Sequence, residues 1–369
     1  MKRRKSGKLT FSCLFGVPVI LIAVFIASCC IEKPVEIIGI KIYEYNGNYE
    51  ALAGTWKDMG INTAFVSAGL AGNNEFREAL IRNDIRMFLI FPVFQDPVSL
   101  EQDSTLYAIT NKGTNARDRW VEFVCPSRVI YRKSKVDELA SIIRRLNPDG
   151  ISIDFIRHFV FWEMIYPGRD PASIDRTCYC DSCVAEFSCL EGITFPDTCR
   201  TLSGKTEWIT RYHQDSWDSF RSELIASMLT ELAAAARQVK PDLVIGAHIV
   251  PWKKNDFGGS IIRVAGQDLE KMAPVVDYVS PMCYSKMLKR DADWIADVVS
   301  EMDLSAPGKV LPSIQVHQAY IDDPFSDDEF RQCVGSALKA PSQGVVFFSW
   351  PLFERDPARM NIAKEMIAR

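Results

Sequence analysis

The sequence predicts an α/β protein folded as a single (β/α)8 TIM barrel with a cysteine-rich insertion after the fourth strand. Short apolar segments with strand periodicity alternate with amphipathic segments of helical periodicity, and this alternation continues from residue 37 to residue 369. Several expected strands are unbroken apolar runs, which is typical of a parallel sheet covered by helices on both faces. No internal repeat or second domain boundary is visible in the sequence, so residues 37–369 are predicted to form one domain.

The first part of the barrel is expected to contain three strands and two helices. The strands are rich in β-branched and aromatic residues, a composition that favours extended backbone. The first helix follows a strand that carries Glu44 near its end, and the second helix places Phe76, Leu80 and Ile81 on one side. The expected elements are strands at 37–45, 63–67 and 86–94 and helices at 49–59 and 74–83.

A polar segment at about residues 97–130 follows the third strand. It includes Trp120, Phe123 and Cys125 but shows no clear strand or helix periodicity. Long segments of this kind usually carry function, so a cover over an active site is expected here.

The fourth strand is the most informative part of the predicted barrel. A helix at 135–146 and a Pro-Asp-Gly turn precede it, and apolar residues then alternate with Ser152 and Asp154. The strand therefore ends on a carboxylate, and Arg157 follows three residues later. Because catalytic groups of such barrels lie at the carboxyl ends of the strands, Asp154 is the first candidate for a catalytic residue.

An insertion at about residues 158–206 follows the fourth strand and contains Cys178, Cys180, Cys183 and Cys189. The tight spacing predicts a cross-link that stabilises the insertion rather than a nucleophile. Disulfides suit an oxidising compartment, and a structural zinc ion with four thiolates suits the same spacing. Apart from this cross-link no cofactor is expected, because no His, Asp and Glu set has the spacing of a catalytic metal site.

The second half of the sequence predicts four more strands, each followed by a helix. The strands at 243–249 (LVIGAHI) and 344–350 (GVVFFSW) are almost wholly apolar, and the long helix at 208–239 ends before Lys-Pro-Asp. The expected elements are strands at 243–249, 277–284, 310–316 and 344–350 and helices at 208–239, 267–272, 292–302, 327–338 and 358–368.

Residues 1–28 resemble a bacterial lipoprotein signal peptide. Five basic residues precede an apolar run that ends in Ile-Ala-Ser before Cys29. The resemblance implies lipidation of Cys29, a tether at 29–36, and a membrane-anchored protein in the cell envelope, outside the cytoplasm. A plain secretory signal or an uncleaved anchor helix is the alternative. Loss of the five basic residues changes the net charge from −4 to −9, which argues against nucleic acid as a partner.

The carboxyl ends of the expected strands carry a mixed set of polar and aromatic residues. Carboxylates beside tryptophan and tyrosine suit a carbohydrate, because sugar C–H faces lie flat on aromatic rings and sugar hydroxyls need fixed hydrogen-bond partners. The set comprises Glu44, Asp96, Asp154, Arg157, His248, Trp252, Tyr284, His317, Gln318 and Trp350.

The string Asp149-Gly-x-x-x-Asp154-x-x-Arg157 resembles the fourth-strand signature of glycosyl hydrolase-like barrels. Those proteins often follow this strand with a Cys-x-Cys-x-x-Cys-x-x-x-Phe string, which residues 178–187 match. The resemblance covers most of residues 37–350 and implies a barrel related to the glycosidases.

Two glycosidase families match this sequence in part. Met282, Tyr284 and Trp350 are similar to residues in the sixth and eighth strands of the chitinase family, but Ile156 stands where that family has its proton-donating glutamate. Asp154 is similar to the nucleophile of the α-amylase family, whose fifth-strand acid has no equivalent here. The acid partner of Asp154 is therefore left open.

The resemblance implies a glycoside hydrolase that acts on a polysaccharide or glycoconjugate. Asp154 is expected to be the nucleophile or general base, with Glu163 or Glu44 as the acid. The expected substrate contacts are Arg157, Tyr284, Trp350, His248, Trp252, His317 and Asp96. The alternative is a surface lipoprotein that binds glycans without cleaving them, which the missing acids on strands five and seven would favour.

Overall fold

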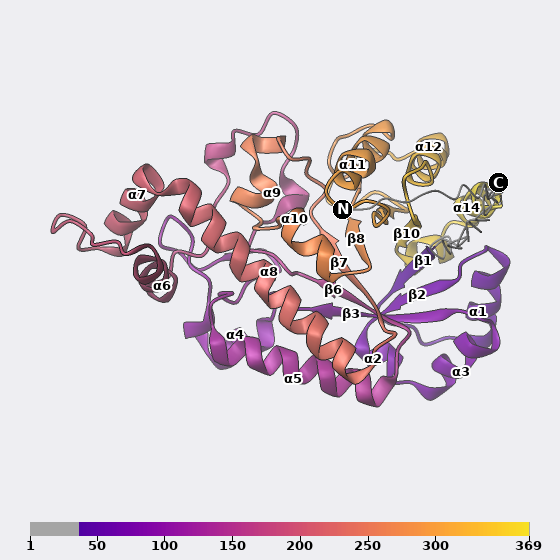
Figure 1. Cartoon of the computed structure of the whole chain (residues 1–369). Coiled ribbons are helices and arrows are strands. Elements are labelled where there is room, and N and C mark those ends of the chain that lie inside the picture. The colour runs from indigo at the N-terminus through magenta and orange to yellow at the C-terminus, as the bar shows by residue number, and fades with distance from the viewer. Residues whose placement is uncertain (1–36, 369) are drawn as a thin grey trace, which may run out of the picture. The chain divides into compact units, whose positions relative to one another are not determined.

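The computed structural model describes residues 37–368, in which eight parallel strands form one sheet that curls into a nearly closed barrel (Figure 1). The strands are hydrogen-bonded in the order β8-β7-β6-β3-β2-β1-β10-β9, and the parallel bridges Val279–Val310 and Met282–Ser313 join the two ends of this order. The predicted α/β barrel is confirmed. Its strands are β1 (Ile37–Ile42), β2 (Thr63–Val66), β3 (Arg86–Pro92), β6 (Gly150–Asp154), β7 (Val244–Ile249), β8 (Tyr278–Pro281), β9 (Ser313–Gln315) and β10 (Gly344–Phe348).

Helices follow the strands and cover the barrel from outside, and Figure 1 shows the two longest, α5 and α8, packed side by side. A short hairpin, β4 (Arg117–Asp118) with β5 (Val121–Glu122), lies in the segment expected to cover the site. The helices are α1 (Tyr49–Asp58), α2 (Ala68–Ala71), α3 (Asn74–Arg82), α4 (Pro97–Gln102), α5 (Val129–Leu146), α6 (Asp181–Glu191), α7 (Leu202–Tyr212), α8 (Gln214–Val239), α9 (Ser260–Arg263), α10 (Leu269–Met272), α11 (Asp293–Asp303), α12 (Asp327–Ala337), α13 (Trp350–Glu354) and α14 (Pro357–Ile367).

The N-terminal features expected from the sequence, namely the signal peptide at 1–28, the lipidated Cys29 and the tether at 29–36, lie outside the described residues. Within residues 37–368, none of the helices combines the length and the hydropathy that crossing a bilayer requires.

Helix α5 begins six residues before the expected start at residue 135. Its first two turns expose Val129 and Ile130 to solvent and bury Arg132 and Lys135, so the apolar pattern is locally reversed. Burial is possible because Arg132 donates a hydrogen bond of 2.8 Å to the carbonyl oxygen of Leu224 on α8.

Two further boundaries differ from the prediction. The helix expected at 208–239 is two helices, because the backbone of His213 (φ −136°) leaves the helical region between α7 and α8. The eighth strand ends at Phe348, and Trp350 is instead the first residue of α13, where Pro351 in the first turn favours a helix start.

Aromatic rings fill the amino-terminal half of the barrel interior. The rings of Phe88 on β3 and Tyr278 on β8 stack with centroids 6.2 Å apart, and Phe65 on β2 packs edge-on against Phe88 at 5.3 Å. Gly246 on β7 faces Tyr278 so closely that an added Cβ atom would lie 1.9 Å from Cζ of the ring. The strand needs glycine here because the ring occupies the space of a side chain.

The alternation of side chains along each strand determines which residues enter the barrel. On β1, Ile40 and Ile42 pack into the layer between strands and helices, whereas Gly39 faces the interior ring of Phe65. Lys41 shares the inward face with Gly39 and lines a cavity above the rings. The interior is therefore closed by rings at one end and lined by polar groups at the other.

Replacing Gly246 with alanine is expected to destabilise the barrel by about 1–3 kcal/mol, because the added methyl group overlaps the buried ring of Tyr278. The matched control is Gly54→Ala in α1, where an added Cβ meets no atom within 4 Å and alanine favours the helix. Urea denaturation of both variants and the parent protein measures the difference. Equal midpoints for Gly246→Ala and the parent would contradict this packing.

Candidate active site

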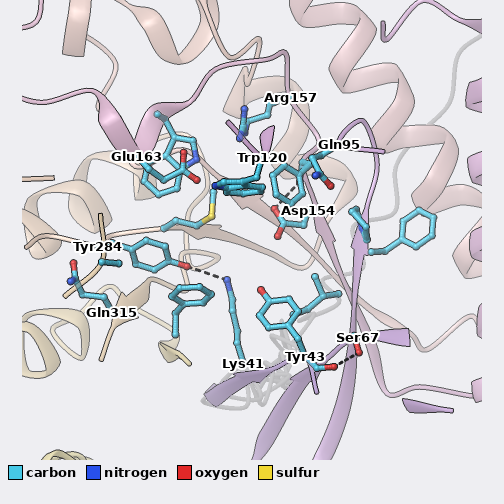
Figure 2. A pocket seen from close by; sticks show the side chains of 18 of the residues that line it. Lys41, Tyr43, Ser67, Gln95, Trp120, Asp154, Arg157, Glu163, Tyr284 and Gln315 are labelled. Carbon is cyan, nitrogen blue, oxygen red and sulfur yellow. Dashed lines mark hydrogen bonds between the residues drawn. The ribbon is translucent and has the colours of Figure 1, made fainter. Parts of the chain in front are cut away.

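A cavity of about 580 Å³ lies at the carboxyl ends of the barrel strands. Figure 2 shows that Asp154, Glu163, Arg157 and Lys41 surround it together with several aromatic side chains. Five of the site residues predicted from the sequence line this cavity: Asp154, Glu163, Arg157, Tyr284 and His317.

Asp154 is the last residue of β6, and its side chain reaches the cavity although the residue is only 7% exposed. The backbone N–H of Phe155 donates a hydrogen bond of 2.7 Å to Oδ1 of Asp154. Phe155 itself has a φ of 50°, which is uncommon for a bulky residue and turns the chain sharply away from the strand. The turn leaves Asp154 at the strand end, where a substrate entering the cavity can reach it.

Glu163 lies in a short 3₁₀ helix, Trp162–Met164, in the loop after β6. The residue is 7% exposed, and its Oε2 atom has no hydrogen-bond partner among the residues of the described chain. Burial raises the pKa of Glu163 to about 7, while the charge of Arg157 opposes this shift. Glu163 is therefore a carboxyl group that keeps its proton up to near-neutral pH.

Arg157 is buried beside both carboxyl groups. Its Nη1 donates hydrogen bonds to the carbonyl oxygens of His158 (3.2 Å) and Val160 (2.8 Å), and its guanidinium lies 4.8 Å from the ring centroid of Phe123. Among residues 37–368 it forms no ion pair with Asp154, and Nη2 has no partner. Burial lowers the pKa of Arg157 to about 10, so the group stays charged at neutral pH.

Lys41 is a cavity residue that the sequence-based prediction missed. It is 1% exposed, and its Nζ donates a long hydrogen bond of 3.5 Å to Oη of Tyr284. Burial lowers the pKa of Lys41 to about 8, and the charge of Asp154 opposes this effect. The signal was present in the sequence, since Lys41 shares strand parity with Gly39 rather than with the isoleucines beside it.

Aromatic rings form the walls of the cavity. Tyr284 stacks on Phe348 with ring centroids 5.1 Å apart. The ring of Trp162 is tilted against the ring of Tyr284, with centroids 5.8 Å apart. At the mouth, Nε1 of Trp120 donates a hydrogen bond of 3.0 Å to Oη of Tyr320, which joins the β4–β5 hairpin to the loop after β9. The expected cover at about 97–130 thus contributes Trp120 to the cavity (Figure 2).

Five of the expected catalytic and substrate-contact residues do not line this cavity, and neither does Gln318: the five are Glu44, Asp96, His248, Trp252 and Trp350. Glu44 is exposed, because the alternation that turns Lys41 inward turns Glu44 away from the interior. Asp96 caps helix α4 and accepts hydrogen bonds from the Ser99 amide and from Oη of Tyr131. Both acidic residues are therefore placed outside the candidate site.

The other three of these residues are buried elsewhere. His248 is 1% exposed inside the barrel, where Nε2 lies 2.9 Å from Oγ of Ser152 and burial lowers its pKa to about 3. Trp252 packs edge-on against Phe257, and Trp350 packs edge-on against Trp56 behind the barrel wall. The aromatic walls of the cavity come from other residues.

Glu138 on α5 is a third carboxylate at the cavity. Its Oε2 forms an ion pair of 2.8 Å with Nζ of Lys135, and its side chain is 49% exposed. Glu138 is therefore paired and solvated, whereas Glu163 is buried and its Oε2 atom has no hydrogen-bond partner among the described residues.

Four cysteine sulfur atoms lie within 4.8 Å of one another: those of Cys125, Cys178, Cys180 and Cys183. The predicted Cys189 is exposed and lies outside this cluster, and its place is taken by Cys125 from the segment before α5. All cysteines in the described part of the chain are free thiols, so the disulfide alternative finds no support there.

The geometry of this cysteine cluster suits a metal ion. Tetrahedral zinc–thiolate bonds of about 2.3 Å place neighbouring sulfur atoms roughly 3.8 Å apart. Sγ of Cys125 lies 3.6 Å from Sγ of Cys180 and 3.4 Å from Sγ of Cys183. These four residues could therefore hold one zinc ion with no open coordination position.

Neither a protein-family model nor a curated protein matches the sequence. The structure is similar to the glycoside hydrolase domain of PgaB (BpsB) from Bordetella bronchiseptica, with a TM-score of 0.69 and 11% identity over 89% of this chain and 98% of that domain. It is also similar to β-galactosidases from the haloarchaeon Halorubrum lacusprofundi (TM-score 0.64, 12% identity) and from Marinomonas ef1 (TM-score 0.66, 10% identity).

The matches to the two β-galactosidases cover 89% of this chain but 57% and 58% of theirs, so the chain corresponds to little more than half of those enzymes. At such low identity the likeness concerns the fold. The chain has the (β/α)8 barrel fold that these glycoside hydrolase structures share.

Proposed function

We propose that this protein is a glycoside hydrolase that cleaves O-glycosidic bonds of a polysaccharide or glycoconjugate. One observation carries the proposal: Asp154 and Glu163 face the same aromatic-walled cavity, and burial raises the pKa of Glu163 to about 7. Glycoside hydrolysis needs two carboxyl groups of this kind, one that donates a proton and one that is ionised.

Glu163 is assigned as the general acid, which protonates the glycosidic oxygen of the leaving sugar. Asp154 is assigned as the nucleophile that attacks the anomeric carbon, or as the base that activates a water molecule for this attack. The negative charge of Asp154 also contributes to the raised pKa of Glu163, so the two groups interact across the cavity. Tyr284, Trp120 and Trp162 offer ring faces on which a sugar can lie.

A glycan-binding protein without catalytic activity is the second candidate. The observation that favours it is the lack of any carboxylate from the ends of β7 and β9 among the cavity residues of the described chain. Such a protein would use the same cavity and aromatic walls. Turnover therefore separates the two candidates, whereas glycan binding does not.

We place the protein in the cell envelope, anchored to the membrane through a lipid on Cys29 after removal of residues 1–28. The support is the basic start, the apolar run and the small residues before the cysteine. A tether at 29–36 would then hold the barrel outside the cytoplasm, where polysaccharides and glycoconjugates are accessible.

A structural zinc ion at Cys125, Cys178, Cys180 and Cys183 is also part of this proposal. Burial raises the pKa of Cys178, so a dry cluster of thiolates is costly unless a cation compensates the charge. The ion would tie the segment before α5 to the insertion after β6. None of the four cysteines lines the cavity of Asp154 and Glu163, so the ion would take no part in the reaction.

Replacing Glu163 with glutamine is expected to lower kcat on unactivated oligosaccharides by about 10²–10⁴-fold, the usual contribution of general acid catalysis. The loss should be much smaller on 4-nitrophenyl glycosides, whose leaving group needs little protonation. Asp154→Asn should abolish turnover of both substrate types. Glu138→Gln is the matched control, because this cavity carboxylate is paired with Lys135 and should leave kcat unchanged. Full turnover by Asp154→Asn would remove the assignment.

The pH profile provides a second test of the same roles. Glu163 must be protonated to act, so kcat should decline as the pH rises through about 7, where the buried carboxyl group loses its proton. The Glu163→Gln variant should lack this alkaline limb on 4-nitrophenyl glycosides. An unchanged limb in that variant would assign the titration to another group.

Purified protein is expected to contain one zinc ion per chain, measured by inductively coupled plasma mass spectrometry. Cys125→Ser should lose the metal and unfold at a lower temperature, with a loss of about 4 kcal/mol if free zinc exceeds the dissociation constant a thousandfold. Cys189→Ser is the control and should keep both metal and stability, because Cys189 is exposed and outside the cluster. Metal-free parent protein with unchanged stability would disprove the site.

A further inference from the structure

The buried ammonium group of Lys41 has no carboxylate within ion-pair distance in the described part of the chain. Its Nζ lies 3.5 Å from Oη of Tyr284 and 5.7 Å from the ring centroid of Phe348. Figure 2 shows the side chain rising from β1 with its amino group directed into the cavity. An ammonium group has three N–H donors, and the phenol oxygen of Tyr284 accepts one of them.

The charges around the cavity do not balance in the state required for proton donation. The proposed roles require Glu163 to be neutral and Asp154 to be negative, while Lys41 and Arg157 both carry a positive charge. Glu138 does not change this count, because it is paired with Lys135. Arg157 also lines the cavity, but its Nη1 is bound to two backbone carbonyl oxygens, whereas Nζ of Lys41 has the phenol of Tyr284 as its hydrogen-bond partner. One positive charge therefore has no counterpart.

A bound substrate makes this imbalance more costly. A sugar that fills the cavity displaces water, and an ammonium group without water needs another negative charge or acceptor. Asp154 does not provide it, since it forms no ion pair with Lys41 within 4.0 Å in the described part of the chain and its proposed role directs it at the anomeric carbon. A neutral sugar would supply hydroxyl oxygens alone, whereas an acidic sugar would supply the missing charge.

We propose that the cavity selects a uronic acid residue, whose carboxylate accepts hydrogen bonds from Nζ of Lys41 and from Oη of Tyr284. This inference rests on the proposed glycoside hydrolase function and specifies its substrate class. A carboxylate fits because its two oxygen atoms can each take one of the two adjacent donors, the ammonium and the phenol. Lys41 is thus a specificity-determining residue, and its partner is a carboxylated sugar in the subsite beside Asp154.

The first arm of the test is turnover. Matched 4-methylumbelliferyl glycosides in both anomeric forms are compared, namely glucuronide with glucoside and galacturonide with galactoside. The parent protein should favour one uronide over its neutral counterpart by about 10–100-fold in kcat/KM, the range expected for a charge-assisted hydrogen bond in a dry site. Lys41→Met should lose this preference, and Lys41→Arg should keep part of it.

The second arm is binding, which does not depend on catalysis. Titration calorimetry of the parent protein compares D-glucuronate with D-glucose and D-galacturonate with D-galactose. Lys289→Met is the control variant, because Nζ of Lys289 lies over the ring of Tyr166 and does not line the cavity. Its affinity for the uronates should equal that of the parent, whereas Lys41→Met should bind uronate and neutral sugar alike.

The outcomes separate this inference from the proposed function. Lys41-dependent uronate binding without turnover supports the inference and contradicts the hydrolase. Turnover of neutral glycosides without any preference for uronides supports the hydrolase and overturns the inference. Equal affinity for glucose 6-sulfate and glucuronate overturns the carboxylate assignment, because the site would then recognise any anion. Should Lys41→Met fail to fold, a parent protein without uronate preference in both arms still overturns the inference.

Discussion

The hydrogen-bonded closure of eight parallel strands is the constraint on which the rest of this structure depends. Once β8 approaches β9, every strand has one face in a shared interior and one face under the helices. Large rings from Phe65, Phe88 and Tyr278 fill the amino-terminal half of that interior, and Gly246 gives one of them its space. Polar inward residues can then gather only toward the carboxyl ends, where the cavity lies.

The same closure buries charged groups away from water, and this burial shifts their pKa values in different directions. Burial raises the pKa of Glu163 to about 7, lowers that of Lys41 to about 8 and lowers that of Arg157 to about 10. Asp154 accepts a hydrogen bond from a backbone N–H at the strand end, and its charge interacts with those of Lys41 and Arg157. One aromatic cavity thus holds the carboxyl groups of Asp154 and Glu163 together with the cationic side chains of Lys41 and Arg157, and three of these four groups have shifted pKa values.

The strands were predictable because unbroken apolar runs mark a doubly covered parallel sheet, and Asp154 followed from its place at the end of one run. Glu44 was expected in the site and Lys41 was not, because the inward face of the first strand was assigned wrongly. Residues an odd number of positions apart on a strand face opposite sides, so Lys41 points inward and Glu44 does not. Trp350 was wrongly expected in the cavity, because the sequence does not distinguish an aromatic residue of a pocket from one of the core when both follow a strand. Cys125 could not be assigned, because its cluster partners lie more than fifty residues away in the sequence.

The cysteine cluster and the active site are connected through the chain. Cys125 follows the β4–β5 hairpin that carries Trp120 over the cavity, and Cys178 lies in the insertion that begins with the loop of Glu163. A cross-link between these segments would restrict both the aromatic cover and the proposed acid, which are loop residues rather than strand residues. Side chains on loops are ordinarily held less precisely than side chains on strands, because loops are more mobile. A zinc ion at this cluster would therefore hold the loop of Glu163, the proposed acid, in position against the strand that carries Asp154.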